Sequence, residues 1–357
     1  MTILELNFEK GWRGGERQTF YNMTGLRDAG NEVHLLCRKN NPLYTKSIEA
    51  GFVTFGFDSV WEICWFLIGK GHNYAILHAQ TSQILTYAVL TKLFHRSPVV
   101  YSRRVDFVPK GFFTRLKYLL ADKILAISKA IQQIVTEFSG RKDVELVSSI
   151  VTAQALDKSR AIELLEKKNI QPGTHILGTM AALVQHKDPL TMVEAISELR
   201  KIRNDFVFLH FGKGDLEPVV QERIIQLGLQ DCYLLMGFYK NVEDFFSIFE
   251  VYVMSSEQEG LGSSVLDAFL YKVPVVTTRA GGLAELGAGE RAMLCDIQDA
   301  AAIGKAIHTV LADPVHKEKM TTLALAYVQQ QHSMEYIIHR YLNVFNKINR
   351  TAVVAHE

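Results

Sequence analysis

Short apolar runs alternate with longer stretches of helical periodicity from one end of the chain to the other. Ten of these runs predict β-strands, and several are continuously apolar, as in parallel strands that helices cover on both faces. They are Thr2–Asn7, Val33–Cys37, Ala75–His78, Val99–Ser102 and Ile124–Ile127 in the first half, then Ile176–Met180, Phe206–Phe211, Tyr233–Met236, Val251–Met254 and Val273–Thr277. Helical patterns such as Lys187–Ile202 and Leu216–Leu227 lie between strands. This alternation predicts two doubly wound α/β domains.

The length of 357 residues also fits about two domains. A charged helical stretch, Ile162–Lys168, runs into a loop with the turn signal Pro172-Gly173. We therefore expect domains at 1–168 and 169–333, with a final helix at about 334–357 completing the first domain. Ligands of such folds bind at the carboxyl ends of the strands, so we expect the site in a cleft between the domains.

Composition narrows the class of protein. With 48% hydrophobic and 22% charged residues, the chain is neither disordered nor collagen-like. A net charge of +1 provides no overall field for nucleic acid, and no nucleic-acid partner is expected. The four cysteines are far apart and form no C-x-x-C, so we expect neither a zinc site nor disulfides, and a reduced, cytoplasmic setting. Glu5 lies where a signal peptide would need an apolar core, so we expect no export signal. The apolar run Val60–Gly69 is too short for a membrane span of about 20 residues.

Charge is distributed unevenly along the chain. Residues 91–130 carry nine basic and two acidic side chains, which predicts a basic face on the first domain. Within this segment, residues 109–120 mix cations with aromatic and leucine side chains. Such a stretch can lie on an anionic membrane, or it can be a helix whose apolar side faces the core. Trp61 and Trp65 share one helical face and are predicted to be core residues rather than a ligand platform.

The most informative glycine cluster follows the predicted strand Val251–Met254 and opens a helix. It reads Ser255-Ser-Glu-Gln-Glu-Gly-Leu-Gly-Ser-Ser-Val-Leu-Asp267. Glycines allow close approach, and the N–H groups of Ser263, Ser264 and Val265 at the helix start would face an anion. Glu259 and Asp267 flank this position and could accept hydrogen bonds from a sugar and a ribose. An ordinary N-capped helix with surface acids is the alternative.

Other glycines and lysines follow neighbouring strands. The cluster Thr278–Glu285 repeats the strand–glycine–helix pattern, and two such turns at one sheet edge point to a nucleoside diphosphate. Gly212-Lys213-Gly214 ends another strand there, and Lys187 begins the helix after the segment Leu177–Val184. Either lysine could neutralise the diphosphate or be a surface residue. In the first half, the loop with Gly14 and Gly15 follows strand one and could approach a phosphate or form a plain tight turn.

From about Ile176 to Val310 the sequence resembles the donor domain of retaining family-4 glycosyltransferases of the GT-B fold. The resemblance rests on five segments in a linked order: HKDPLTMVEA, FGKGD, GF at 237–238, SSEQEGLGSSVLDAF and VPVVTTRAGGLAEL. The first half matches more loosely, through Gly14-Gly15-Glu16, His78-Ala79-Gln80 and the strand ending at Ser128. The resemblance implies two Rossmann-like domains facing across a cleft, and transfer of a hexose-type sugar from a UDP- or GDP-linked donor.

The resemblance also implies roles for individual residues. Glu259 matches the first acid of the family's E-x7-E motif, which handles the donor sugar, and Asp267 the second, which holds the ribose. Lys187 matches the basic residue on the diphosphate. The remaining donor contacts that we expect come from Gly14, Gly15, Gly212, Lys213, Leu261, Gly262 and Ser263. Nothing in this set binds a metal, and the sequence holds no Asp-x-Asp motif. Helix and lysine charge would stabilise the leaving diphosphate without one.

Several positions depart from the family pattern. The second acid is Asp267 where the family has Glu, and the family's arginine falls on Ala182. We hypothesise that Arg103 or Arg104, directly after an apolar strand, supplies the missing positive charge. The alternative places both on the solvated basic face.

Two other functions remain open at this stage. A sugar-nucleotide epimerase or hydrolase shares the fold, and the departures permit a degenerate, non-catalytic GT-B subunit. For the transferase, the resemblance implies a glycan or lipid-linked acceptor in bacterial lipopolysaccharide or other surface polysaccharide synthesis. It also implies a place in the cytoplasm, at the inner face of the cell membrane.

Overall fold

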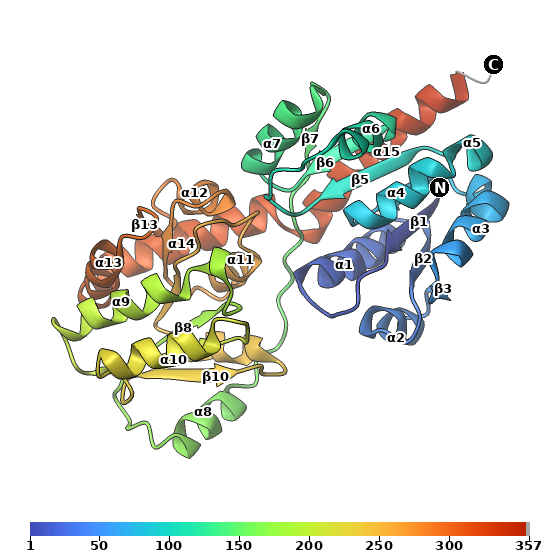
Figure 1. Cartoon of the computed structure of the whole chain (residues 1–357). Helices are drawn as coiled ribbons and strands as arrows, with labels where there is room; N and C mark the ends of the chain where they lie inside the picture. The colour runs from blue at the N-terminus through green and yellow to red at the C-terminus, as the bar shows by residue number, and fades with distance from the viewer. Residues whose placement is uncertain (355–357) are drawn as a thin grey trace. The chain divides into compact units, whose positions relative to one another are not determined.

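The computed structural model describes residues 1–354, with side chains through residue 349. It divides into two compact units (Figure 1). The first unit is Met1–Ile150 with the chain from Gln331 onward, and the second unit is Val151–Gln330. Each is an α/β domain built on a parallel sheet, as the strand–helix alternation predicts.

Within the described residues, the first unit has a seven-stranded parallel sheet in the order β3-β2-β1-β4-β5-β6-β7. Its strands are β1 (Thr2–Asn7), β2 (Glu32–Arg38), β3 (Val53–Phe57), β4 (Ile76–Ala79), β5 (Val99–Arg103), β6 (Lys123–Ala126) and β7 (Glu145–Leu146). Its helices are α1 (Gly14–Asp28), α2 (Pro42–Glu49), α3 (Val60–Lys70), η1 (Gly71–Asn73), α4 (Ser82–Leu90), α5 (Lys92–His95), α6 (Phe112–Leu120), α7 (Lys129–Ser139) and α15 (Met334–Val354).

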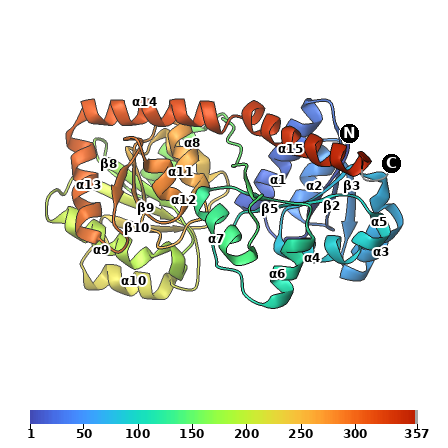
Figure 2. The same ribbon diagram turned by 90° about the horizontal axis from the view of Figure 1, so that it is seen from above.

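Helix α15 comes from the far end of the chain and packs on α1 of the first unit (Figure 2). Its residues Ile338, Tyr341 and Phe345 join one buried cluster with Met23 and Leu26 of α1. The expected final helix began at about residue 334, and its last three positions, 355–357, lie outside the described residues.

The second unit, within the same described range, has a six-stranded parallel sheet in the order β10-β9-β8-β11-β12-β13. Its strands are β8 (His175–Met180), β9 (Phe206–Phe211), β10 (Tyr233–Gly237), β11 (Val251–Met254), β12 (Val275–Thr278) and β13 (Met293–Cys295). Its helices are α8 (Lys158–Lys167), η2 (Gln185–Lys187), α9 (Pro189–Arg200), α10 (Glu217–Gln226), η3 (Val242–Ser247), α11 (Ser263–Leu270), α12 (Gly282–Gly287), α13 (Ala300–Ala312) and α14 (Pro314–Gln331).

The expected domain boundary at 168/169 lies inside the second unit, because α8 belongs to that unit. Helix α8 packs on η3 and buries Ala161 and Leu164. Arg160 pairs with the buried Asp244 of η3, with 2.6 Å between Nη1 and Oδ2. The turn at Pro172-Gly173 therefore separates α8 from β8 within one unit.

The prediction that Trp61 and Trp65 are core residues is wrong: 77% and 70% of their surfaces are exposed. Helix α3 has a second stripe at the same spacing, Ile63 and Leu67, and this stripe is fully buried. Since one helix face can meet the sheet, the tryptophans face outward.

Candidate functional site

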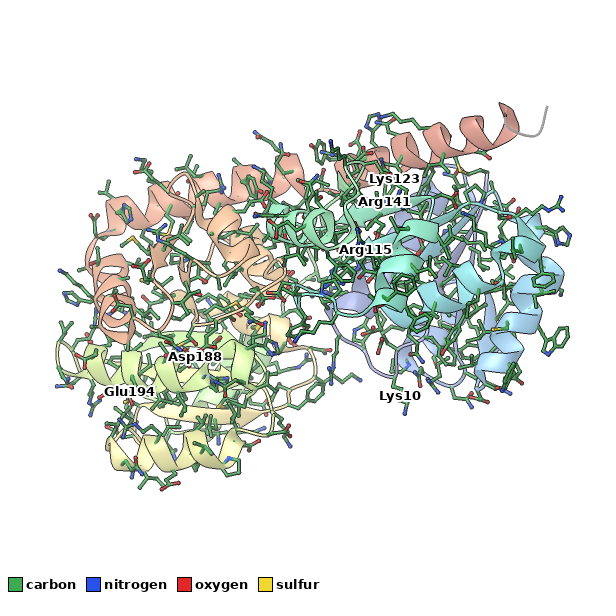
Figure 3. All side chains as sticks on the ribbon, turned by 45° about the horizontal axis from the view of Figure 1, so that its top comes forward. Lys10, Arg115, Lys123, Arg141, Asp188 and Glu194 are labelled. Carbon is green, nitrogen blue, oxygen red and sulfur yellow. The ribbon has the colours of Figure 1, made fainter. Side chains whose placement is uncertain are left out.

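The carboxyl ends of β8, β9, β11 and β12 share one edge of the second sheet, because all these strands are parallel. Four loops leave this edge, and they carry Lys187, Gly212-Lys213, Glu259 and Gly281. The edge therefore brings together the candidate donor residues of the second unit. Asp188, labelled in Figure 3, lies in this region at the start of α9.

Lys187 and Glu259 form an ion pair between Nζ and Oε2, and both side chains are largely buried. Two loops are tied together to hold this pair. Ser255 donates its hydroxyl to the carbonyls of Lys187 and Asp188, at 3.1 and 2.8 Å. The N–H groups of Glu257 and Gln258 donate to the carbonyl of His186, at 3.0 and 3.2 Å. Hydrogen bonds between the loop that joins β8 to α9 and the loop that joins β11 to α11 therefore hold Lys187 next to Glu259.

Gly212 is required where the loop after β9 meets the loop after β8. Its φ is +151°, and a Cβ atom there would lie 1.9 Å from the carbonyl oxygen of Ala181. The carbonyl of Lys213 accepts the N–H of Leu183 at 3.2 Å, and the Lys213 side chain is exposed. Any other residue at position 212 would push the two loops apart.

Gly262 precedes α11 in the left-handed region, with φ of +92°, and a Cβ atom would lie 2.5 Å from Leu283 Cδ2. Leu261 and Gly262 are buried, and Ser263 begins the helix. The expectation that the N–H of Val265 faces an anion is wrong, because this N–H donates to the carbonyl of Gly262 at 3.0 Å. The helix start thus offers the N–H groups of Ser263 and Ser264.

Asp267 lies one turn further along α11 and is half-buried. Beneath the same helix lies Tyr252, a residue that the sequence patterns did not single out. Burial raises the pKa of Tyr252 to about 12, and its hydroxyl accepts the N–H of Met180 at 3.2 Å. Tyr252 therefore links the ends of β8 and β11 below the candidate donor residues.

The first unit has its own pocket, with a volume of about 650 Å³, at the carboxyl ends of β1, β4 and β5. Its lining includes Glu9, Lys10, Gly15, Gln80, Ser82 and Arg104. Gly14 and Gly15 are the first residues of α1, and nothing lies within 4 Å of a Cβ atom built on Gly15. Lys10 in the loop after β1 is labelled in Figure 3.

Arg104 and Arg103 differ sharply in position. Arg104 lines the pocket, and its Nε and Nη2 donate to Gln80 Oε1 at 3.2 and 3.1 Å. Arg103 is buried on β5, where it donates to the Tyr118 hydroxyl and to the carbonyl of Phe107. The alternative that both arginines lie on a solvated face is wrong for Arg103.

A chain of buried polar groups under the pocket was not found from the sequence. Glu5 accepts from His78 and from Gln80 at 2.8 and 2.7 Å, and the other ring nitrogen of His78 lies 2.8 Å from Ser102 Oγ. The motif His78-Ala79-Gln80 was visible in the sequence. Its partner Glu5, however, comes from another strand, and only the register of β1 against β4 brings them side by side.

Residues 161–324 match the family model described as Glycosyl transferases group 1. The chain carries a glycosyl transferases group 1 domain. Curated relatives agree: the lipopolysaccharide core biosynthesis glycosyltransferase LpsE of Rhizobium meliloti (strain 1021) is 25% identical over 65% of this chain and 66% of its own length. LpsD of the same organism is 21% identical over 97% of this chain and 98% of its own length. The chain is an enzyme of the glycosyltransferase class.

Solved structures share the fold of this glycosyltransferase. A glycosyltransferase from Rickettsia africae ESF-5 superposes with a TM-score of 0.85, at 18% identity, over 97% of this chain and 98% of that one. HepE of Anabaena, solved in complex with UDP, gives a TM-score of 0.83 at 17% identity over 97% and 100%. The predicted fold class, GT-B with two doubly wound domains, is confirmed. Among the described residues, no cluster of three or more His, Cys, Asp or Glu side chains could hold a metal ion. No described helix combines the length and apolar character needed to cross a bilayer.

Proposed function

We propose that this glycosyltransferase is a retaining family-4 enzyme that transfers a hexose-type sugar from a nucleoside-diphosphate sugar to a glycan or lipid-linked acceptor. The observation that carries the proposal is the pairing of Lys187 with Glu259 beside the N-terminus of α11. A cation, a carboxylate and two N–H groups lie within one cluster of loops, which suits a sugar diphosphate.

The donor would bind with its diphosphate at Lys187 and the N–H groups of Ser263 and Ser264. Departure of the nucleoside diphosphate builds negative charge on the β-phosphate oxygens. A lysine and a helix N-terminus stabilise that charge where it develops, without a metal ion. Glu259 positions the sugar hydroxyls, Asp267 accepts from the ribose, and Gly212, Lys213, Leu261 and Gly262 shape the loops around the diphosphate.

The first unit would supply the acceptor side. Its pocket carries Arg104, and Gly14 and Gly15 open α1 beside it. In a front-face retaining reaction the acceptor hydroxyl attacks the same face from which the diphosphate leaves, and no enzyme nucleophile is needed. Arg104 would then add the positive charge that Ala182 does not provide. Arg103 would not contact the substrates and would act by stabilising the part of the first unit that forms the pocket.

The printed names of the relatives suggest the setting. Two of them are lipopolysaccharide core glycosyltransferases, and HepE was solved with UDP and with UDP-glucose. We place this enzyme in the synthesis of bacterial lipopolysaccharide or a related surface polysaccharide, with UDP or GDP in the donor. It would work in the cytoplasm at the inner face of the membrane, in contact with anionic lipid through residues 109–120.

The test is a thermal-shift panel with EDTA, using UDP, GDP, ADP, TDP, CMP and their sugar conjugates. A ligand at 100 times its dissociation constant stabilises a protein by about 2.7 kcal/mol, which such a panel resolves. We expect a shift with UDP or GDP, lost in Lys187→Ala. Hydrolysis or epimerisation of the donor without any acceptor would favour the epimerase or hydrolase. No thermal shift with any of these ligands would favour a degenerate subunit and overturn the proposal.

A further inference from the structure

Three helices of the first unit turn apolar side chains to the solvent. On α6, Phe112 and Phe113 are 73% and 82% exposed, while Tyr118 is fully buried. Lys117 also points inward, where it donates to Ser82 Oγ at 2.8 Å, and burial lowers its pKa. A surface helix of a globular protein normally shows the opposite arrangement, with apolar residues inside and charges outside.

Helix α5 repeats this inverted pattern. Leu93 and Phe94 are 85% and 63% exposed, whereas His95 is buried and its Nε2 lies 3.0 Å from the carbonyl of Ala88. Helix α3 adds the exposed Trp61 and Trp65. The alternative that residues 109–120 present an apolar side to the core is therefore wrong for most of α6.

These helices lie on neighbouring elements of the first unit (Figures 1 and 2). Helix α3 packs against α5, and α4 contacts α3, α5 and α6. The ammonium group of Lys92 on α5 donates to the carbonyl of Leu120 at the end of α6, at 3.0 Å. Because Leu119 and Leu120 are also exposed, the apolar side chains extend from α3 across α5 to α6.

Exposed cations border this surface. Lys70 ends α3, Arg96 follows α5 and Lys110 precedes α6. Arg115 lies on α6 (Figure 3). The acids near it are Asp58 and Glu62 at the start of α3, Asp106, and Asp122, which pairs with Lys92 at 2.7 Å. Basic side chains therefore predominate around the exposed phenylalanines and leucines of α5 and α6, and α3 adds the two tryptophans.

We propose that α3, α5 and α6 together form a docking surface for an anionic lipid bilayer. Exposed phenylalanine and leucine enter the acyl boundary, tryptophans favour the headgroup level, and lysine and arginine pair with anionic headgroups. The proposal rests on the proposed function, which places residues 109–120 against anionic lipid, and deepens it by extending that contact to α3 and α5. Its test does not depend on any sugar donor.

Binding is measured by sedimentation with vesicles of phosphatidylcholine alone and of phosphatidylcholine with phosphatidylglycerol. We expect the whole protein to sediment with the anionic vesicles and to be released by salt. Trp61→Ala with Trp65→Ala, and separately Phe112→Ser with Phe113→Ser, should each weaken binding several-fold. Lys110→Ala with Arg115→Ala should weaken it by roughly thirtyfold. Val315→Ser, an equally exposed apolar side chain on α14 of the second unit, should change nothing.

Tryptophan fluorescence gives a direct readout on α3. The chain has three tryptophans, so a Trp12→Phe variant leaves only Trp61 and Trp65. Its emission should shift to the blue on addition of anionic vesicles. Absence of that shift, or vesicle binding that survives the α3 and α6 variants, would overturn the proposal. So would self-association abolished by the same variants, since it would identify the surface as a protein interface.

Nucleotide binding separates this proposal from the proposed function. UDP or GDP should stabilise the α3 and α6 variants as much as the wild type, which also shows that the variants fold. If no nucleotide binds but vesicles do, the proposed function fails and the lipid surface stands.

Discussion

His78 Nδ1 lies 2.8 Å from Glu5 Oε1, and both side chains are completely buried. The same carboxylate accepts from Gln80, whose amide oxygen in turn accepts from Arg104 at the pocket wall. The buried Glu5 of β1 is thus linked through the side-chain amide of Gln80 to Arg104, a candidate site residue. The strands β1, β4 and β5 supply these groups, so the register of the sheet determines where Arg104 lies.

Replacing Glu5 by alanine should lower the free energy of unfolding by about 3 kcal/mol, because it leaves buried donors on His78 and Gln80 without their acceptor. Urea denaturation measures this change. Glu49→Ala, at an exposed position on α2, is the matched control and should stay within about 0.5 kcal/mol of the wild type. Equal stability of the two variants would contradict the importance of the buried network.

Substitution of Arg103 should lower the stability of the protein, whereas substitution of its neighbour Arg104 should lower turnover. Arg103→Ala removes a buried guanidinium that donates to Tyr118 and Phe107, and should cost about 2 kcal/mol of unfolding free energy. Arg104→Ala should leave stability nearly unchanged and reduce turnover by about tenfold or more. Lys142→Ala, at an exposed position outside the pocket, controls for net charge. Normal turnover in both the Arg103 and Arg104 variants would remove arginine from the mechanism.

The sequence predicted most of the fold, and the misses share a physical cause. All ten predicted strands are present within a few residues of their expected ends. The strands that were missed are β3, β7 and β13, and each lies at an edge of its sheet. Edge strands are short and partly exposed, so they lack the continuous apolar run that marks a buried parallel strand.

The candidate site was predictable only in part for a similar reason. Local motifs located Lys187, Glu259 and Gly262, because a loop after a parallel strand always lies at the same sheet edge. Their pairing depends on Ser255 and on backbone contacts to His186, which no local pattern shows. Likewise, Trp61 and Ile63 are both apolar and belong to stripes with the same spacing on α3, and only the packing of α3 decides which one is buried.

Glu259→Gln should dissociate donor binding from turnover. In the structure the carboxylate of Glu259 neutralises Lys187. The amide frees the lysine charge for the diphosphate, so UDP or GDP without a sugar should bind several-fold more tightly, by about 1 kcal/mol. Turnover should fall by about 100-fold, because the sugar loses a charged acceptor. Calorimetric titration measures the first effect and product formation the second.

Glu257→Gln, on the same loop, is the control for net charge. It should alter neither nucleotide affinity nor turnover. Wild-type turnover in Glu259→Gln would contradict the role given to Glu259, and weaker binding of the nucleotide would contradict the competition for Lys187.

His210 on β9 should make the stability of the protein depend on pH. Burial lowers its pKa from 6.5 to about 4, and the neutral ring donates from Nε2 to the carbonyl of Ala181 and accepts from the Tyr233 hydroxyl. Between pH 6.5 and about 4, His210 binds a proton in the unfolded chain but stays neutral in the folded chain. The stabilising contribution of the neutral ring is therefore complete above pH 6.5 and is lost as the pH falls toward about 4, to a limit of about 3 kcal/mol.

Urea denaturation at a series of pH values between these limits tests the effect. His210→Gln should start from a lower stability at neutral pH, yet lose less of it on acidification, because glutamine does not titrate. His72→Gln, at an exposed position in η1, should retain the full loss seen in the wild type. An unchanged pH slope in His210→Gln would mean that other groups cause the acid sensitivity. Because His210 contacts Ala181 at the end of β8, its protonation would also loosen the loops that carry Lys187 and Gly212.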